Sequence, residues 1–306
     1  MRALVLGAAG MLGHRVWREL HEHMEAYAAI RRSYDDVASL SWFDRPSVIE
    51  RIDVSSDADL DRAFSVAKPD VVINAVGIVK QRDDANAVQT ISINALLPHK
   101  LAARCSDAGA RLIHVSTDCV FSGSRGHYTE QDTPDARDLY GRSKLLGEVG
   151  EADCLTIRTS MVGREIGSSR GLIEWFVAHR GETVPGFTRA RFSGLSTVEL
   201  ARLIRRVIDE HVDLRGVWHV AGEQISKFEL LSIVNDTFGL GTTIVADDSF
   251  VCDRTLDATR FMNATGYRPP SWAAMVAEMA ADPTPYDEWT TQWTSIAANH
   301  STASTS

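Results

Sequence analysis

Tyr140 and Lys144, four residues apart, are the two side chains of this sequence best suited to acid–base chemistry. Residues at this spacing lie on one face of a helix. Because a neighbouring ammonium group favours the charged tyrosinate, we expect Lys144 to lower the pKa of Tyr140 from its ordinary value of about 10. A tyrosine tuned in this way can donate a proton to a carbonyl oxygen, or accept one from an alcohol, near neutral pH. The chain has only five lysines, so a tyrosine and a lysine at this spacing are not expected by chance. An ordinary contact on a helix surface is the alternative.

A hydroxyl side chain, Thr117, follows shortly after an apolar run at residues 111–115. If this run is a strand, Thr117 and its neighbour Asp118 lie at the carboxyl end, where doubly wound folds bind their ligands. We expect Thr117 to hydrogen-bond the oxygen atom that Tyr140 protonates. The alternative is an ordinary turn after a strand.

A glycine-rich loop near the N-terminus separates a first apolar run from a helix-length segment at residues 11–23. Glycine lets the backbone turn sharply and approach a pyrophosphate, and the following helix offers unpaired N–H groups to the phosphates. The spacing is G-x-x-G-x-x-G, and the alternative is a tight turn that binds no ligand. The residues that we expect to contact a dinucleotide here are Gly7, Gly10, Met11, Leu12 and Gly13.

Two arginines, Arg31 and Arg32, stand where the second strand is expected to end. Cofactor-binding domains for NAD usually have a carboxylate at this place, whereas guanidinium groups suit the 2′-phosphate of NADP. The sequence therefore favours NADP(H), with NAD(H) possible, although solvated surface arginines are the simpler alternative. Further cofactor contacts are expected from Asp53 and Val54 at the end of a third strand, and from Asn74, Ala75 and Val76 at the end of a fourth.

Short apolar runs alternate with helix-length periodic segments through the first half of the chain. This alternation predicts an α/β fold in which right-handed crossovers build a doubly wound parallel sheet, the Rossmann fold. We assign residues 1–160 to this dinucleotide-binding domain. Its expected strands are residues 3–6, 27–30, 71–75, 111–115 and 155–159, and the longest expected helix is 86–108.

Beyond residue 160 the elements become shorter and more mixed, which predicts a smaller C-terminal α/β region for substrate at residues 161–282. Some of its segments could return to the first domain. A Gly/Pro/Arg-rich stretch at 181–194 is expected to be irregular, and residues 283–306, which lack periodicity, are expected to form a poorly ordered tail. The other expected elements are helices at 171–179, 197–211 and 226–238 and a strand at 217–220.

Composition excludes several classes of protein. The 306 residues carry a formal net charge of −9, so no overall positive field attracts nucleic acid or an anionic membrane. The four cysteines lie far apart, which is typical of free thiols in a reducing compartment and not of a disulfide framework or a zinc site. We expect a cytoplasmic protein with no metal site. A signal peptide beginning at Arg2 is the alternative, but glycines interrupt its apolar run.

Three motifs together resemble the extended short-chain dehydrogenase/reductases, and most of all the dTDP-4-dehydrorhamnose reductase family. They are the glycine loop, Ser116-Thr-Asp-Cys-Val-Phe-Ser-Gly123 and Leu139-Tyr-Gly-Arg-Ser-Lys-Leu-Leu-Gly-Glu148, and the likeness extends to about Trp272. The resemblance implies that Thr117, Tyr140 and Lys144 form a catalytic triad and that the C-terminal region holds a nucleotide sugar. It also suggests substrate contacts from Asp118, Cys119 and Arg158.

Two departures from the family pattern are visible. Cys119 replaces an aromatic residue, and because related dehydratases have a glutamate there, a dehydration is not expected. The segment at 185–191 is also altered, which leaves the identities of the sugar and the nucleotide open. Its arginines, Arg189 and Arg191, are candidates for binding a diphosphate through bidentate hydrogen bonds, with surface charge as the alternative. We also expect Lys80, Gln81 and Trp175 near the substrate, but only their positions in the sequence support this.

The expected function is NAD(P)H-dependent reduction of a 4-keto-6-deoxy nucleotide sugar, with Tyr140 as the proton donor and Lys144 on the nicotinamide ribose. One alternative is a nucleotide-sugar epimerase that keeps NAD tightly bound. Another is a regulatory subunit that binds NADP without turnover, a role that this fold performs in a methionine adenosyltransferase assembly. A homodimer is the expected form of self-association.

Overall fold

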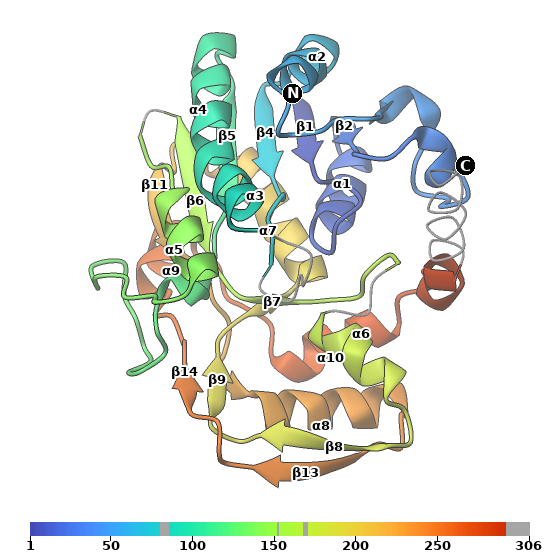
Figure 1. The fold of residues 1–306 in the computed structure, drawn as a ribbon, viewed down its shortest axis with the longest axis vertical. Helices are drawn as coiled ribbons and strands as arrows, with labels where there is room; N and C mark the ends of the chain where they lie inside the picture. The colour runs from blue at the N-terminus through green and yellow to red at the C-terminus, as the bar shows by residue number, and fades with distance from the viewer. Residues whose placement is uncertain (80–85, 152, 168–170, 292–306) are drawn as a thin grey trace.

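A computed structural model describes residues 1–79, 86–151, 153–167 and 171–291. Its central feature is a seven-stranded sheet with the order β11-β6-β5-β4-β1-β2-β3, in which all the paired strands are parallel. The chain runs outward from β1 in one direction and then returns to run outward from β4 in the other. This confirms the doubly wound parallel sheet (Figure 1). The strands are β1 (Arg2–Leu6), β2 (Glu25–Ala29), β3 (Val48–Ile49), β4 (Val71–Asn74), β5 (Arg111–Val115), β6 (Cys154–Arg158) and β11 (Gly216–His219).

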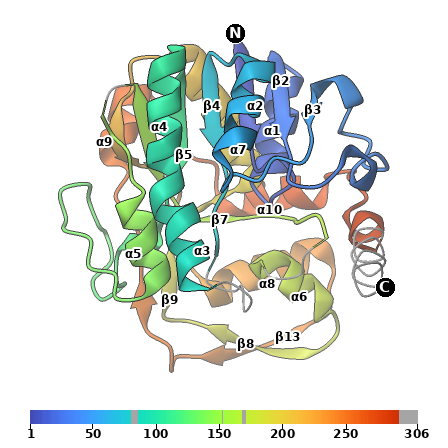
Figure 2. The same cartoon turned by 45° about the horizontal axis from the view of Figure 1, so that its top comes forward.

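Each face of the sheet buries its own core, as the alternation of side chains along a strand requires. In β1, Ala3 and Val5 pack into one cluster, whereas Leu4 and Leu6 pack into the other. Helices α1 (Gly13–His21) and α7 (Thr197–Glu210) cover the first face, and α2 (Asp57–Ala67) and α4 (Leu97–Ala108) cover the second (Figure 2). Ahead of α4 come α3 (Ala87–Ile91) and a π-helical turn (Ser92–Leu96), and α5 (Leu139–Leu146) packs beside both.

The expected strand at 217–220 is one of the segments that return to the first domain: it joins the main sheet as β11, where it pairs with β6. One strand of the sheet differs from the sequence prediction. The third strand, β3, ends at Ile49, so Asp53 and Val54 lie beyond it and not at its end. The backbone nevertheless stays close to β2, because the Ile52 N–H donates to the Ile30 carbonyl at 2.9 Å.

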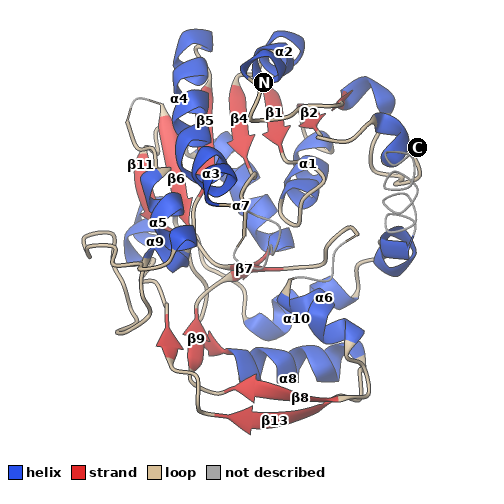
Figure 3. Cartoon of the chain, in the orientation of Figure 1, coloured by secondary structure: helices blue, strands red, loops and turns tan. Residues whose placement is uncertain are grey.

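A smaller region lies beyond the carboxyl ends of the strands (Figure 3). The stretch 181–194, which we expected to be irregular, instead forms two strands, β8 and β9, because it pairs with segments that follow later in the chain. Three small sheets result: β10-β7, β12-β9-β14 and β13-β8. The elements are β7 (Met161–Val162), α6 (Leu172–Ala178), β8 (Thr183–Phe187), β9 (Ala190–Phe192), β10 (Leu195–Ser196), β12 (Ile225–Ser226), α8 (Lys227–Phe238), β13 (Thr243–Asp247), β14 (Cys252–Asp253) and α10 (Trp272–Ala280). Helix α9 (Thr259–Thr265) packs against β11 at the edge of the main sheet.

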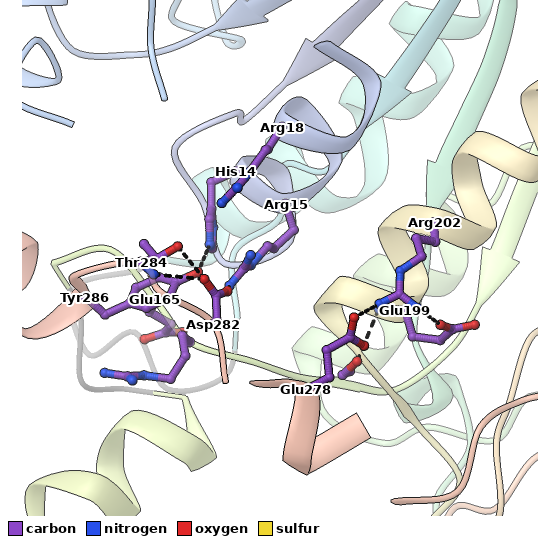
Figure 4. A network of polar contacts seen from close by, with 12 residues as sticks. His14, Arg15, Arg18, Glu165, Glu199, Arg202, Glu278, Asp282, Thr284 and Tyr286 are labelled. Atoms are coloured by element: carbon purple, nitrogen blue, oxygen red, sulfur yellow. Dashed lines mark hydrogen bonds and ion pairs between the residues drawn. The ribbon is translucent and has the colours of Figure 1, made fainter. Parts of the chain in front are cut away.

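Residues 283–291, the first part of the expected tail, pack against the start of α1. Tyr286 and Trp289 are both buried, and the Tyr286 hydroxyl lies 2.9 Å from His14 Nε2. Just before them, Asp282 forms a buried ion pair with Arg15 (Figure 4). Sequence periodicity missed this segment because it is held by two aromatic side chains. It has no regular apolar face that a periodic pattern could reveal. No helix in the described ranges is long and apolar enough to cross a membrane.

Candidate functional site

The glycine loop joins β1 to α1 in a conformation that depends on its glycines. Gly7 has φ +80°, a left-handed conformation that favours glycine, and a Cβ there would lie 3.0 Å from a methyl group of Val76. A Cβ on Gly13 would collide with the Gly7 carbonyl oxygen. The Gly10 N–H donates to that same oxygen at 2.8 Å. Helix α1 therefore begins in direct contact with the end of β1.

The N-terminus of α1 is suited to an anion. Its N-cap residue, Leu12, makes no side-chain cap, and the first turn contains no acidic residue. The first N–H groups of a helix have no partner within the helix, and its dipole favours negative charge there. The loop and this helix end thus fit the pyrophosphate of a dinucleotide. Met11 lies in the same turn and is partly exposed.

The structure places the expected adenosine-side residues near the same edge of the sheet. The Ala8 N–H donates to the Ala29 carbonyl at 3.3 Å, which joins the glycine loop to the end of β2. Arg31 is exposed and Arg32 is partly exposed just beyond that point. The Asp53 carboxylate accepts the Ser55 N–H at 2.9 Å, so it is held in a turn with its side chain exposed.

Asn74 does not face the ligand side as expected. It is fully buried, its Oδ1 accepts the Val76 N–H at 3.1 Å, and its Nδ2 lies 3.1 Å from Nδ1 of His114 on β5. Only Ala75 and Val76, which are partly exposed and lie against Gly7, remain on the ligand side.

Thr117 caps a short 3₁₀ turn (Asp118–Val120) at the end of β5. Its Oγ1 accepts the Cys119 N–H at 3.1 Å and donates to the Asp118 carboxylate at 3.2 Å. Asp118 is buried, and this burial raises its pKa. Burial also raises the pKa of the Cys119 thiol to about 12, so this cysteine is not a thiolate nucleophile at neutral pH.

Tyr140 lies in the first turn of α5, opposite Thr117. The helix begins at Asp138, whose carboxylate accepts the Gly141 N–H at 2.9 Å. A Cβ on Gly141 would collide with the Cys119 carbonyl oxygen, so α5 packs directly on the 3₁₀ turn. This packing sets Tyr140 near Thr117, which acts on the pKa of the Tyr140 phenol.

The expectation that Lys144 lowers the pKa of Tyr140 is wrong for this structure. Burial of Tyr140 raises its pKa, and Cys119 and Asp118 act in the same direction. The Lys144 ammonium nitrogen instead donates to the Val115 carbonyl at 2.7 Å. Lys144 is itself buried, and this burial lowers its pKa to about 8.

Two buried polar residues near Lys144 were missed by sequence reasoning. His114 lies behind Lys144, with Nε2 3.5 Å from Nζ. Asn94, in the π-helical turn, accepts the Ile78 N–H at 2.8 Å and donates to the Ile78 carbonyl at 2.9 Å and to Ser143 at 3.3 Å. It therefore ties the segment after β4 to α5. A polar residue within an apolar helix face was the signal available for Asn94.

Arg158 is not placed to bind substrate. Its guanidinium group is buried and donates to both carboxylate oxygens of Glu148, at 2.8 and 2.7 Å. Ser116 donates to the same carboxylate at 2.8 Å. Because both donors of this bidentate pair are used within the protein, we correct the sequence prediction and assign Arg158 to the support of β5 and β6.

The other expected substrate residues lie in the smaller region. Arg189 is exposed between β8 and β9, and Arg191 is partly exposed on β9, where it acts electrostatically on Glu229. Trp175, on α6, is partly exposed and packs beside His179. Lys80 and Gln81 lie outside the described residues. Within the described ranges, no group of three or more His, Cys, Asp or Glu side chains is arranged to hold a metal ion.

This sheet, with a glycine cradle and a Thr/Tyr/Lys cluster at its carboxyl end, places the protein in the class of short-chain dehydrogenase/reductase folds. The chain belongs to the RmlD substrate binding domain family, whose model matches residues 1–284. This membership confirms the resemblance found in the sequence.

Among curated proteins, the chain is 31% identical over 272 residues to the probable low-salt glycan biosynthesis reductase Agl14 of Haloferax volcanii, covering 85% of this chain and 87% of that one. It is 24% identical to methionine adenosyltransferase 2 subunit beta of Rattus norvegicus, covering 78% and 72%. Among solved structures, a hypothetical dTDP-4-dehydrorhamnose reductase from Sulfolobus tokodaii matches with TM-score 0.74 and 27% identity, covering 89% and 98%. Other proteins of this fold have been solved with NADP or with NAD.

Proposed function

We propose that the protein is an NADP(H)-dependent reductase of a 4-keto-6-deoxy nucleotide sugar. The observation that carries the proposal is the packing of α5 on the turn after β5, which sets Tyr140 near Thr117 at the carboxyl end of the sheet. It sets a proton donor near a second hydroxyl, so that one carbonyl oxygen can approach both. Membership of a family whose relatives include a probable glycan biosynthesis reductase supports it.

The cofactor is assigned to the cradle of residues 7–13 and to the edge of the sheet beyond β2. Arg31 and Arg32 would contact the 2′-phosphate, which favours NADP(H) over NAD(H). Lys144 would hold the nicotinamide ribose hydroxyls. When bound, the reduced nicotinamide supplies the hydride that reduces the keto carbon.

Tyr140 supplies the proton. Because burial raises its pKa, Tyr140 stays a neutral phenol at physiological pH and releases its proton only to a strongly basic oxygen, such as the alkoxide formed in the reduction. The Thr117 hydroxyl, which donates to Asp118 in this structure, would turn its hydrogen to the carbonyl oxygen and orient that group. This protonation state suits a reductase better than an enzyme whose first step removes a proton from an alcohol.

The nucleotide sugar is assigned to residues 161–282, apart from β11 and α7, which belong to the main sheet and its helix layer, and residues 1–160 are proposed as the cofactor domain. Asp118 and Cys119 would contact the sugar, and Arg189 and Arg191 would bind the diphosphate. All four cysteines are free thiols, which supports the proposed cytoplasmic location. The expected homodimer stays a prediction, to be tested by mass measurement in solution.

NADPH consumption against a panel of 4-keto-6-deoxy nucleotide sugars tests this function. Tyr140→Phe should lower kcat by about 10²- to 10⁴-fold, since general acid catalysis is worth roughly this much, while the Kd for NADPH stays unchanged. Tyr27→Phe, on β2 and bonded to Glu25, is the matched control and should keep full activity. Unchanged turnover of the Tyr140 variant would refute the proposed chemistry.

A regulatory subunit is the second candidate, favoured by the match to methionine adenosyltransferase 2 subunit beta. It predicts NADPH binding without turnover on every sugar of the panel. Retention of cofactor through desalting, together with interconversion of sugars without net NADPH use, would instead identify an epimerase.

A further inference from the structure

A buried histidine joins the glycine cradle to the C-terminal strap, by which we mean residues 282–291. His14, fully buried in the first turn of α1, lies between the two (Figure 4). Its Nδ1 is 2.8 Å from the Gly10 carbonyl oxygen, and its Nε2 is 2.9 Å from the Tyr286 hydroxyl. Tyr286 lies beyond residue 284, where the match to the family model ends. The proposed reaction uses neither His14 nor Tyr286, so their contact calls for a separate explanation.

The partners of His14 determine where the hydrogens of this contact lie. A carbonyl oxygen can only accept, so Nδ1 of His14 carries a hydrogen and donates it to Gly10. In a neutral imidazole Nε2 is then the acceptor nitrogen, and the Tyr286 hydroxyl donates to it. Burial keeps both side chains uncharged, because it lowers the pKa of His14 to about 3 and raises the pKa of Tyr286 to about 12. Two hydrogen bonds in series therefore connect the strap to the cradle.

The Gly10 carbonyl determines the direction of one N–H group of the cradle. It accepts two hydrogen bonds, one from His14 Nδ1 at 2.8 Å and one from the His14 backbone N–H at 3.0 Å. The peptide bond between Gly10 and Met11 is trans, and in a trans peptide the C=O group and the next N–H group point in opposite directions. Because the carbonyl is held toward His14, the Met11 N–H points out of the end of α1, where the pyrophosphate is expected.

Two arginine side chains hold Tyr286 in place. The Arg164 guanidinium lies over the Tyr286 ring, 4.8 Å from its centroid, and donates to Asp287 at 2.7 Å. The Arg15 guanidinium lies 5.4 Å from the same centroid and forms the buried ion pair with Asp282 (Figure 4). The strap is thus attached on both sides of Tyr286, and the hydroxyl that donates to His14 has a defined position.

We propose that His14 and Tyr286 are positioning residues for the cofactor: the strap, through the Tyr286 hydroxyl and the His14 ring, holds the peptide after Gly10 in the orientation that presents its N–H group to the pyrophosphate of NAD(P)H. The inference rests on the proposed function only in placing that cofactor in the glycine cradle. A peptide that is fixed before binding loses less freedom when the cofactor arrives, and such preorganisation raises affinity. The C-terminal strap is therefore part of the cofactor site, although it does not touch the cofactor.

Tyr286→Phe removes only the hydroxyl and tests the proposal directly. We expect the Kd for NADPH, measured by cofactor fluorescence, to rise about three- to tenfold, the factor that corresponds to one net hydrogen bond. The Kd for NADH should rise by the same factor, because both cofactors contain the pyrophosphate. The matched control is Tyr267→Phe, which also loses a buried hydroxyl, bonded to Glu199 at 2.9 Å, and should change neither Kd. An unchanged Kd in Tyr286→Phe, or a loss confined to NADPH, would overturn the proposal.

A double variant tests whether Tyr286 acts through His14. In His14→Asn the side-chain NH₂ group can replace Nδ1 as the donor to Gly10, but the shorter side chain no longer reaches the Tyr286 hydroxyl. Adding Tyr286→Phe to His14→Asn should therefore leave the Kd for NADPH unchanged, since residues that act through one contact are not additive. A further loss of about three- to tenfold in the double variant would show that Tyr286 acts by another route, and the proposal would fail.

The coupling can also be measured in the wild-type protein, which requires no folded variant. Binding linkage is reciprocal, so a strap that favours cofactor binding is itself stabilised by the bound cofactor. The Trp289 N–H, which donates to the Pro285 carbonyl at 3.0 Å, should exchange with deuterium about threefold more slowly, or slower still, when NADPH is saturating. An exchange rate that NADPH does not change would overturn the proposal.

These measurements separate the inference from the proposed function. If the protein reduces no nucleotide sugar but Tyr286→Phe weakens NADPH binding as expected, the proposed function fails and the role of the strap stands. If the protein reduces a sugar and Tyr286→Phe binds NADPH like the wild type, the positioning role fails alone. In the active enzyme, Tyr286→Phe should raise KM for NADPH and leave kcat nearly unchanged, because the strap acts on binding and not on the chemical step.

Discussion

The charged side chains that the sequence assigned to substrate or catalysis are held in opposite ways at the carboxyl end of the main sheet and in the smaller region. At the carboxyl end of the sheet, Lys144, Arg158 and Asp118 are all buried and bonded within the protein. In the smaller region, Arg189 is exposed and Arg191 is partly exposed, on short strands. Charges fixed by strand ends are preorganised but also support the fold, whereas exposed charges can adapt to a ligand at little cost to stability.

The largest effect that distinguishes the two regions is expected for Arg158. Arg158→Met leaves the Glu148 carboxylate buried without its bidentate partner, and breaking such a pair costs about 3–5 kcal/mol. Chemical denaturation should show a free energy of unfolding lower by this amount. Turnover per folded molecule, measured well below the transition, should change little.

The double variant Arg158→Met/Glu148→Leu is the control for this prediction. Removing both charges should restore part of the lost stability, because no unpaired buried charge remains. If Arg158→Met instead raised KM for the sugar nucleotide and left the free energy of unfolding unchanged, Arg158 would contact the substrate, as the sequence resemblance suggested.

An intermediate effect is expected for Arg31, at the edge of the sheet. Arg31→Ala should weaken NADPH binding by about 10-fold and leave NADH binding almost unchanged, since roughly 1.4 kcal/mol from one charged contact to a phosphate corresponds to that factor. Cofactor fluorescence titration measures both constants. The control is Arg2→Ala, at the opposite end of β1, and equal losses for NADPH and NADH would show that Arg31 does not read the 2′-phosphate.

The same contrast explains what the sequence could predict. Periodicity located the strands of the main sheet to within a residue or two, except β3, because buried parallel strands are apolar on both faces. The sequence also located the glycine loop between β1 and α1, and Tyr140 and Lys144 on one helix, because strand ends and helix turns fix those positions locally. The pattern could not show the sign of the pKa shift at Tyr140, which depends on burial by segments distant in sequence.

Residues whose roles depend on tertiary partners escaped prediction. Arg158 matched a family motif, but its partner Glu148 and the hydroxyl of Ser116 become neighbours only when β5 and β6 pair. His114 looked like any polar residue in a strand until its two neighbours were placed. The strands β8 and β9 were missed because residues 181–194 have strand geometry only through pairing with later segments.

The smallest effect on stability is expected for Arg189. This variant tests whether the exposed charges of the smaller region bind substrate without supporting the fold. Arg189→Ala removes an exposed charge, so the unfolding free energy should change by less than about 0.5 kcal/mol. If Arg189 contacts the diphosphate, KM for the sugar nucleotide should rise about three- to tenfold while kcat and the NADPH Kd stay constant, because a rim charge contributes about 1 kcal/mol. Arg180→Ala, also exposed and just after α6, is the matched control. A loss of stability or of NADPH binding in Arg189→Ala would show that this charge supports the fold or the cofactor, and the division between a preorganised sheet edge and an adaptable substrate region would then fail.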